Sequence, residues 1–265
     1  MISKDFSVIN KHGIKLACTI DLPENNDSLI PNPLSLRRRS VSYALFLHCF
    51  TCTKELKTIA NINSVLTEAG YSIVRFDMTG IGSSEGEFKN TNYTTQLEDT
   101  ECVLDYMREN FGFPELIIGH SLGGSVAVFT AQKHGEIKAL VTIATASEPA
   151  KLALKLKRTR ERSIADGSAK TEIGGVSFEF KPQFFDDLEK YHMKHVLQNM
   201  SKPLLIMHSP VDSYADISNA SEIFRNARHP KSFIYLNNID HLILNKEDAE
   251  YVGGLIRAWA SKYTT

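Results

Sequence analysis

Short apolar runs alternate with longer segments of helical period along most of this chain. The apolar runs predict buried strands at Tyr43–His48, Ile73–Phe76, Leu116–Ile118, Ala139–Ile143, Leu204–Met207 and Phe233–Leu236. The helical periods lie between them, at Lys54–Ala69, Thr95–Asn110, Leu122–Lys133, Asp216–Ala227 and Lys246–Lys262. Strands that are apolar throughout and separated by amphipathic helices are typical of a parallel sheet covered on both faces. The pattern therefore predicts an α/β protein with a mostly parallel central sheet.

Three segments depart from this alternation. Residues Ser7–Asn10 and Ile14–Leu22 predict an opening hairpin, and the Asn-, Pro- and Ser-rich stretch Pro23–Ser40 predicts a long surface loop. Ser147–Lys202 is much longer than the helix of a strand–helix–strand unit, which takes about 30 residues in all. An insertion at this place would lie over the carboxyl ends of the strands, where open α/β sheets bind ligands. We expect one domain over residues 1–265 with a small cap insertion at 147–202.

Three patterns predict the elements of this insertion. It begins with a basic run, Lys151–Arg162, continues through a Gly174-Gly175 hairpin, and ends in a helical stretch, Phe184–Gln198. The basic run is typical of a solvated helix face, and a role at an anionic substrate or a membrane surface is the alternative.

Composition narrows the functional classes. The chain has 265 residues, of which 42% are hydrophobic, so it can bury one sizeable core. Its formal net charge is −1, which leaves no overall basic field for nucleic acid. No apolar stretch approaches the roughly 20 residues of a membrane span. The four cysteines do not suggest a disulfide scaffold and, with the mixed polar N-terminus, they favour a reducing cytoplasm.

The stretch Gly119-His-Ser121-Leu-Gly123 directly follows a predicted strand. Glycines two residues before and after a serine remove side chains that would collide where a strand turns sharply into a helix. A serine hydroxyl is a weak nucleophile near neutral pH, so it needs a base, and the base needs an acid to orient it. The pattern predicts that Ser121 is a nucleophile at the tip of such a turn.

The base and the acid should follow the serine as an acid and then a histidine, each just past a strand. Asp212 follows the strand Leu204–Met207, and His241 follows the strand Phe233–Leu236. We expect a Ser121, Asp212 and His241 catalytic triad. Asp216 and Asp240 compete with Asp212 for the role of the acid, but Asp216 opens a helix, where a carboxylate is useful as a cap.

Acyl transfer also needs two backbone donors for the developing oxyanion. We assign them to the amides of Leu122, at the start of a helix, and Phe50, in the loop after the third strand. Substrate contacts are expected from Phe184, Phe185 and His208. Cys49 and Cys52 form a C-x-x-C pair, but without a second ligand pair or a thioredoxin-like strand order redox or zinc use is disfavoured. We expect no metal and no organic cofactor.

These motifs together resemble the α/β-hydrolase superfamily. The resemblance rests on His48-Cys-Phe50, Phe76-Asp77-Met-Thr-Gly80-Ile-Gly82-Ser-Ser84 and Gly119-His-Ser121-Leu-Gly123, and it covers nearly the whole chain. More closely, the chain is similar to the hydrolase half of bacterial proteins that fuse such a domain to an OsmC-like domain. The resemblance implies the α/β-hydrolase fold and a carboxylesterase-type Ser-Asp-His site. The oxyanion loop departs from the common His-Gly start, and no OsmC-like segment follows Thr265, so a free-standing relative and an excised half both stay open.

The expected function is that of a serine carboxylic-ester hydrolase acting on small acyl esters. A serine rather than an aspartate or a cysteine at position 121 favours acyl transfer to water. A thioesterase or a carbon–carbon bond hydrolase would use the same three residues, and a non-catalytic ligand-binding or interaction module is the alternative of a different class. A small-molecule ester is the only partner predicted.

Overall fold

Eight strands form one sheet in the computed structural model, which describes residues 1–24 and 41–264. The strands are β1 (Ile2–Ile9), β2 (Lys15–Leu22), β3 (Ser42–Leu47), β4 (Tyr71–Phe76), β5 (Leu116–His120), β6 (Ala139–Ile143), β9 (Leu204–His208) and β10 (Lys231–Tyr235), in the order β1-β2-β4-β3-β5-β6-β9-β10. From β4 to β10 every neighbouring pair is parallel, whereas β1 and β2 pair antiparallel at one edge. The predicted mostly parallel sheet and opening hairpin are confirmed. Most of the predicted loop Pro23–Ser40 lies outside the described residues.

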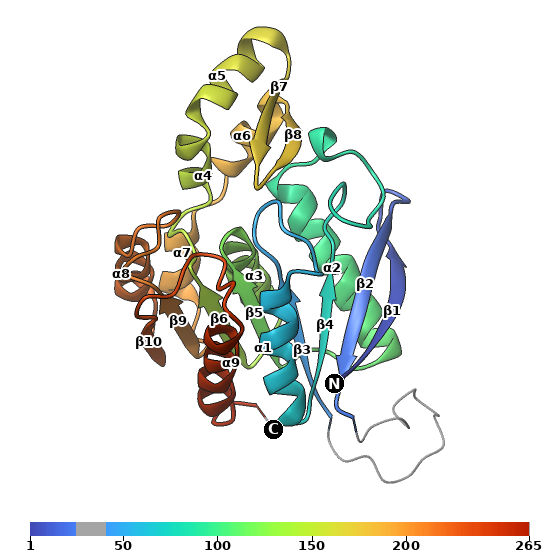
Figure 1. Cartoon of the computed structure of the whole chain (residues 1–265), viewed down its shortest axis with the longest axis vertical. Helices are drawn as coiled ribbons and strands as arrows, with labels where there is room; N and C mark the ends of the chain where they lie inside the picture. Colours follow the sequence, from blue (N-terminus) through green and yellow to red (C-terminus); the bar gives the residue numbers. More distant parts are fainter. Residues whose placement is uncertain (25–40, 265) are drawn as a thin grey trace.

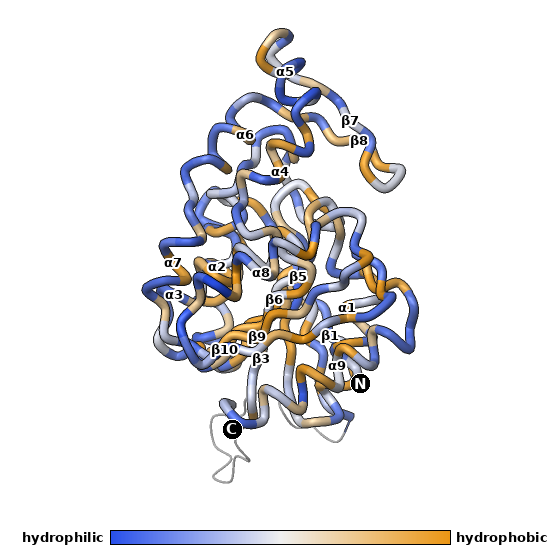
Figure 2. The backbone as a smooth tube through the Cα atoms, turned by 90° about the vertical axis from the view of Figure 1, so that its left-hand side faces the viewer, coloured by the Kyte–Doolittle hydropathy of each residue, from blue (hydrophilic) through white to orange (hydrophobic). Residues whose placement is uncertain are grey.

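Helices cover both faces of the sheet (Figure 1). One face carries α1 (Lys57–Glu68) and α9 (Lys246–Ala260), and the other carries α2 (Tyr93–Asn110), α3 (Leu122–Lys133) and α8 (Ser218–Asn226). Successive strand residues alternate between the two cores: Phe46 packs with α1 and α9, and Leu47 packs with α2 and α3. The central strands are therefore buried on both faces and mostly apolar, and they lie at the hydrophobic centre of the molecule in Figure 2.

Local hydrogen bonds decide where several helices begin. Asn92 caps α2, because its side chain accepts a hydrogen bond from the Thr95 amide while the Thr95 hydroxyl accepts one from the Asn92 amide. Asn245 caps α9 by accepting from the amides of Glu247 and Asp248. The first predicted helix begins at Lys57 rather than at Lys54, and the amide and carbonyl of Lys54 bond outside the helix, to Asp77 and Arg75.

Residues 147–202, here called the cap segment, rise beyond the carboxyl ends of the strands (Figure 1). The segment contains α4 (Ala150–Lys155), α5 (Lys157–Asp166), β7 (Ala169–Ile173), β8 (Val176–Phe180), α6 (Pro182–Leu188) and α7 (Met193–Asn199). The predicted hairpin is present, with both Gly174 and Gly175 at positive φ. The helical stretch predicted over Phe184–Gln198 is present as two helices, α6 and α7, with a break between Leu188 and Met193.

The break between α6 and α7 has a tertiary cause. Tyr191 reaches across to the Thr94 hydroxyl, at 2.7 Å, and the amide of Met193 donates to the Glu148 carboxylate, also at 2.7 Å. These contacts come from residues far away in sequence, so local helical periodicity could not reveal them. No helix in residues 1–24 and 41–264 is long and apolar enough to span a bilayer.

Candidate active site

Ser121 lies at the sharp turn between β5 and α3. Its backbone is at φ 54° and ψ −119°, a strained region for a residue with a side chain, and its amide donates to the Ile143 carbonyl at 2.8 Å. Side chains on the flanking glycines would collide with backbone. A Cβ on Gly119 would lie 2.3 Å from the Gly123 oxygen, and one on Gly123 would lie 2.4 Å from the His48 oxygen. The glycine spacing therefore lets the start of α3 approach both β5 and the loop after β3.

The structure brings Ser121, His241 and Asp212 together from three separate strand ends. His241 Nε2 lies 3.1 Å from Ser121 Oγ, and His241 Nδ1 lies 2.7 Å from Asp212 Oδ2. Because a carboxylate can only accept, Nδ1 carries the proton and donates to Asp212. This tautomer leaves Nε2 free to accept from the Ser121 hydroxyl.

Asp212 is fixed by backbone donors on its other oxygen. Oδ1 accepts from the amides of Tyr214 and Ala215, at 2.7 and 2.8 Å. Burial alone would raise the pKa of Asp212, but hydrogen bonds from His241 and from these amides outweigh it and hold the pKa below its ordinary value. The acid is therefore ionised at neutral pH.

The competing carboxylates are used elsewhere. Asp216 Oδ1 accepts from the Ser218 amide at the start of α8, at 2.9 Å. Asp240 accepts from the amides of Leu242 and Leu244, at 2.8 and 3.2 Å. The structure therefore places Asp212, and neither Asp216 nor Asp240, against the imidazole of His241.

Two contacts to His241 were not foreseen from the sequence. His120 Nε2 donates to the His241 carbonyl at 2.7 Å, and the Tyr214 ring stacks on the His241 ring with centroids 5.1 Å apart. Burial lowers the pKa of His120 to about 3, so this histidine stays neutral beside the imidazole. The motif shows that His120 adjoins the serine, but its partner is 121 positions away and leaves no local pattern.

Residues 48–54 follow β3 and lie against the start of α3. They are here called the oxyanion loop, after the role that the sequence predicts for them. Among the described residues, neither the Phe50 amide nor the Leu122 amide donates to a protein acceptor. Both amides are therefore free to donate to a bound group.

Cys49 and Cys52 are joined by a disulfide within this loop. The cysteine content did not suggest a disulfide scaffold, and this single bridge was not predicted. The turn between them, closed by the Cys52 amide on the Cys49 carbonyl, brings their Cα atoms to 5.3 Å, within the range that a disulfide spans. Cys18 and Cys102 are free thiols.

The three predicted substrate-binding residues are all buried, and they lie in two separate places. Phe184 and Phe185 are fully buried in an aromatic cluster, where the Phe184 ring lies 5.6 Å from that of Phe50. His208 is buried behind Asp212 and donates from Nε2 to the Ala215 carbonyl at 2.7 Å. A cavity of about 470 Å³ opens beside the oxyanion loop, and its lining includes Thr51, Phe88 and Phe178 but none of these three residues.

The basic run belongs to α4 and α5 of the cap segment. Lys151 pairs with Glu222 at 2.9 Å, Arg160 pairs with Glu189, and Lys155 lies 5.7 Å above the ring of Tyr214. Within the described residues, no group of three or more His, Cys, Asp or Glu side chains could hold a metal ion.

The fold and the site together define a hydrolase of the α/β class. Residues 46–173 match the family described as serine aminopeptidase, S33. The esterase domain of a Rhodothermus marinus protein is 36% identical over 99% of both chains, with a TM-score of 0.76. The chain belongs to the α/β-hydrolase superfamily, and the predicted fold is confirmed. Its closer resemblance to the hydrolase half of OsmC-like fusion proteins stays a prediction.

More distant proteins share the fold. Est1E from Butyrivibrio proteoclasticus, solved with ferulic acid, is 20% identical over 97% of this chain and 98% of its own, with a TM-score of 0.73. The palmitoyl-protein thioesterase ABHD10 of Homo sapiens is 23% identical over 189 residues, which are 68% of this chain. The match spans 60% of the length of that thioesterase.

Proposed function

We propose that this protein is a serine carboxylic-ester hydrolase that acts on small acyl esters. The observation that carries the proposal is the unbroken hydrogen-bond chain from Ser121 Oγ through the His241 ring to Asp212. The 36% identity to an esterase domain over 99% of the chain supports the same class of substrate. Phe50 and Leu122 are proposed as the oxyanion donors.

The geometry supports a two-step reaction. Ser121 Oγ attacks the ester carbonyl while His241 Nε2 takes the hydroxyl proton, and the amides of Phe50 and Leu122 bind the oxyanion. The intermediate collapses when His241 returns the proton to the leaving alcohol. A water molecule then attacks the acyl-enzyme with His241 as base, which releases the acid and restores Ser121. Asp212 keeps the proton on His241 Nδ1 and stabilises the imidazolium in both steps.

The cap segment would select among substrates in this proposal. Both partners of Ser121 lie outside residues 147–202, while Phe184 of the cap segment packs on Phe50 of the oxyanion loop. A short cap favours acyl groups of about two to six carbons over long chains, because only a modest pocket fits beneath it.

Thioester hydrolysis is the second candidate, because a thioesterase is among the relatives of this chain. The same triad serves both reactions, so substrate comparison separates them. A panel of esters and thioesters with matched acyl groups should give higher kcat/KM for the short esters.

A fluorophosphonate tests the chemistry itself. Folded protein should be labelled at Ser121 and at no other serine at low excess, and both Ser121→Ala and His241→Ala should abolish labelling. Peptide mass spectrometry that finds Ser121 unmodified in protein with esterase activity would end the proposal.

A further inference from the structure

The turn that follows β4 holds the oxyanion loop at both ends. We infer that Asp77 and Arg75 are positioning residues that fix this loop, and with it the Phe50 amide, in the geometry that the transition state needs. The inference rests on the proposed function, since it assigns these residues a part in oxyanion binding.

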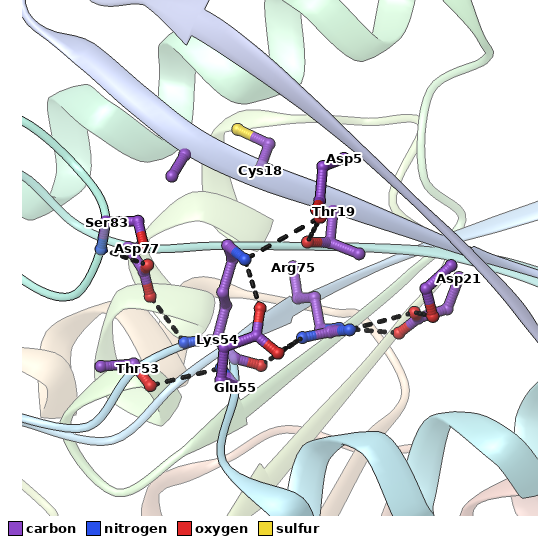
Figure 3. A network of polar contacts seen from close by, with 12 residues as sticks. Asp5, Cys18, Thr19, Asp21, Thr53, Lys54, Glu55, Arg75, Asp77 and Ser83 are labelled. Carbon is purple, nitrogen blue, oxygen red and sulfur yellow. Dashed lines mark hydrogen bonds and ion pairs between the residues drawn. The ribbon is translucent and has the colours of Figure 1, made fainter.

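Lys54, at the end of the oxyanion loop, has both of its peptide groups bound by β4 and the turn after it. Its amide donates to Asp77 Oδ1 at 2.6 Å, and its carbonyl accepts from Arg75 Nη1 at 2.5 Å. Figure 3 shows Asp77 on one side of Lys54 and Arg75 on the other. A backbone position held by two charged side chains has little freedom to shift, because both bonds are charge-assisted and buried.

His48, at the start of the loop, is held by the neighbouring residue of the same turn. The Met78 amide donates to His48 Nε2 at 3.3 Å, so the proton is on Nδ1, which donates to the Cys49 carbonyl at 2.8 Å. Burial lowers the pKa of His48, which agrees with a neutral ring that accepts at Nε2. Residues 49–53, which include Phe50, thus lie between two residues, His48 and Lys54, that are both held by hydrogen bonds from β4 and the turn after it.

The carboxylate of Asp77 has no ion-pair partner in the part of the chain that the structure describes, although it is 1% exposed. Instead its oxygens accept from two amides, Lys54 on Oδ1 and Ser83 on Oδ2 at 2.9 Å. Burial of a charge is costly unless hydrogen bonds satisfy it, and here those bonds join the oxyanion loop to the turn after β4. Gly82 lies against this carboxylate, since a Cβ there would be 2.3 Å from Oδ2. A side chain at position 82 would therefore collide with the Asp77 carboxylate.

Arg75 is anchored in the same way. Its Nε donates to Asp21 Oδ2 at 2.8 Å, and Asp21 in turn accepts from Asn63 of α1 at 2.8 Å. The guanidinium is therefore a rigid bridge from the antiparallel edge of the sheet to the oxyanion loop, a geometry that a lysine could not reproduce.

Asp99 provides a matched control for a purely structural role. It is fully buried on α2 and holds the same turn, because it accepts from the Thr79 amide at 2.8 Å and from Asn10 at 2.7 Å. It makes no hydrogen bond to the oxyanion loop. Removal of Asp99 should therefore perturb the turn while the bonds from Asp77 and Arg75 to Lys54 stay in place.

The experiment compares Asp77→Ala with Asp99→Ala in the full chain, using a short-chain p-nitrophenyl ester and a trifluoromethyl ketone of the same acyl length. The Ser121 hydroxyl adds to the carbonyl of the ketone, and the negatively charged oxygen of the resulting hemiketal lies where the oxyanion forms. The ketone Ki therefore reports binding of the transition state, whereas KM reports the ground state. We expect Asp77→Ala to lower kcat on the order of 10²-fold, the cost of a displacement of about 1 Å in a catalytic group. The ketone Ki should weaken by a similar factor, with KM within about twofold. Asp77→Asn, which keeps one acceptor oxygen, should recover part of the loss.

Two results would overturn the inference. One is a loss of kcat no larger in Asp77→Ala than in Asp99→Ala, and the other is a loss confined to KM with the ketone Ki unchanged. If Asp77→Ala does not fold, Asp77→Asn and Arg75→Lys are compared with Asp99→Asn by the same ketone Ki, and equal values reject the inference. Wild-type protein that neither turns over the ester nor reacts with a fluorophosphonate would refute the proposed function and this inference with it. If the wild-type protein is active and the Asp77 variants keep its kcat and ketone Ki, only this inference is refuted and the proposed function stands.

Discussion

Gly123 packs directly on the backbone of His48. A Cβ at Gly123 would lie 2.4 Å from the His48 carbonyl oxygen and 2.5 Å from that of Leu47, distances that real Cβ atoms essentially never show. The second glycine of the serine motif therefore sets how close the start of α3 comes to the oxyanion loop. The same contact fixes the separation between the two amides proposed to bind the oxyanion.

Gly123→Ala should thus separate these amides and leave the three proposed catalytic side chains chemically intact. We expect kcat to fall by about 10²-fold, as for other displacements of about 1 Å in an active site. Gly135→Ala is the control, because a Cβ at Gly135 meets nothing within 4 Å and its φ is not positive. Steady-state kinetics and urea unfolding of both variants test the idea. Normal kcat in folded Gly123→Ala would show that the contact does not govern the reaction.

Asp212→Asn should lower kcat by roughly 10⁴-fold, as neutralisation of a triad acid does, because the amide can favour the wrong tautomer of His241. Asp240→Asn is the matched variant, since Asp240 adjoins His241 in sequence but bonds to the amides of Leu242 and Leu244. It should retain kcat within about tenfold, with some loss of stability from the weakened turn. The assignment of the acid is wrong if the order of the two effects is reversed.

The pKa of Asp212 also predicts how acid affects stability. Its folded-state pKa lies below the ordinary value of 3.8, so the native contacts of the carboxylate stabilise the fold fully above that pH. The contribution is lost as the pH falls from 3.8 through the lower folded-state pKa. The difference in free energy of unfolding between wild type and Asp212→Asn should therefore shrink on acidification across this window. Urea titrations at pH 6 and at successive values below pH 4 measure it, and a constant difference would contradict the shift.

The sheet could be predicted from the sequence because its central strands are buried on both faces and carry continuous apolar runs, such as Leu116–Ile118 within β5. The positions of Ser121, Asp212 and His241 could be predicted as well, because each follows a strand and parallel strands end at the same edge. The two distances that join them, 3.1 Å from Ser121 Oγ to His241 Nε2 and 2.7 Å from His241 Nδ1 to Asp212 Oδ2, are visible only in the structure.

Contacts between distant residues could not be predicted in this way. The role inferred for Asp77 depends on its bond to the Lys54 amide, 23 positions away in sequence. The break between α6 and α7 coincides with contacts to Thr94 and Glu148, which are also distant in sequence. Nothing in the periodicity of one segment records a partner in another. The C-x-x-C spacing did mark Cys49 and Cys52, but a turn that brings two thiols together looks the same in sequence as one that separates them.

The thiols of the folded protein should differ from those of the unfolded chain. Burial raises the pKa of Cys18 to about 12, so this thiol should resist iodoacetamide at pH 8 in native protein. In denaturant without reductant, two cysteines should be alkylated, Cys18 and Cys102, because Cys49 and Cys52 are joined. All four should react after reduction. Peptide mass spectrometry reads each site, and four alkylated cysteines without reductant would rule out the disulfide.

Phe184 and Phe185 offer a test of how the cap segment reaches the site. Both are buried, but the Phe184 ring contacts that of Phe50 at 5.6 Å, whereas Phe185 packs on Phe180 at 5.7 Å and on Phe184. Phe→Ala in a core costs about 3 to 5 kcal/mol, a large share of the ~5 to 15 kcal/mol that stabilises a typical domain. Leucine is therefore the better replacement.

We expect Phe184→Leu to make room beside Phe50 and to shift the preferred acyl length by about one or two carbons, because each methylene that fits a pocket is worth ~1 to 3 kcal/mol. Phe185→Leu should cost similar stability and leave the acyl profile unchanged. The measurement is kcat/KM across p-nitrophenyl esters of increasing acyl length, with fluorophosphonate labelling of Ser121 to count active sites. If both variants shift the profile equally, the cap segment acts on the site through its general packing rather than through the contact between Phe184 and Phe50.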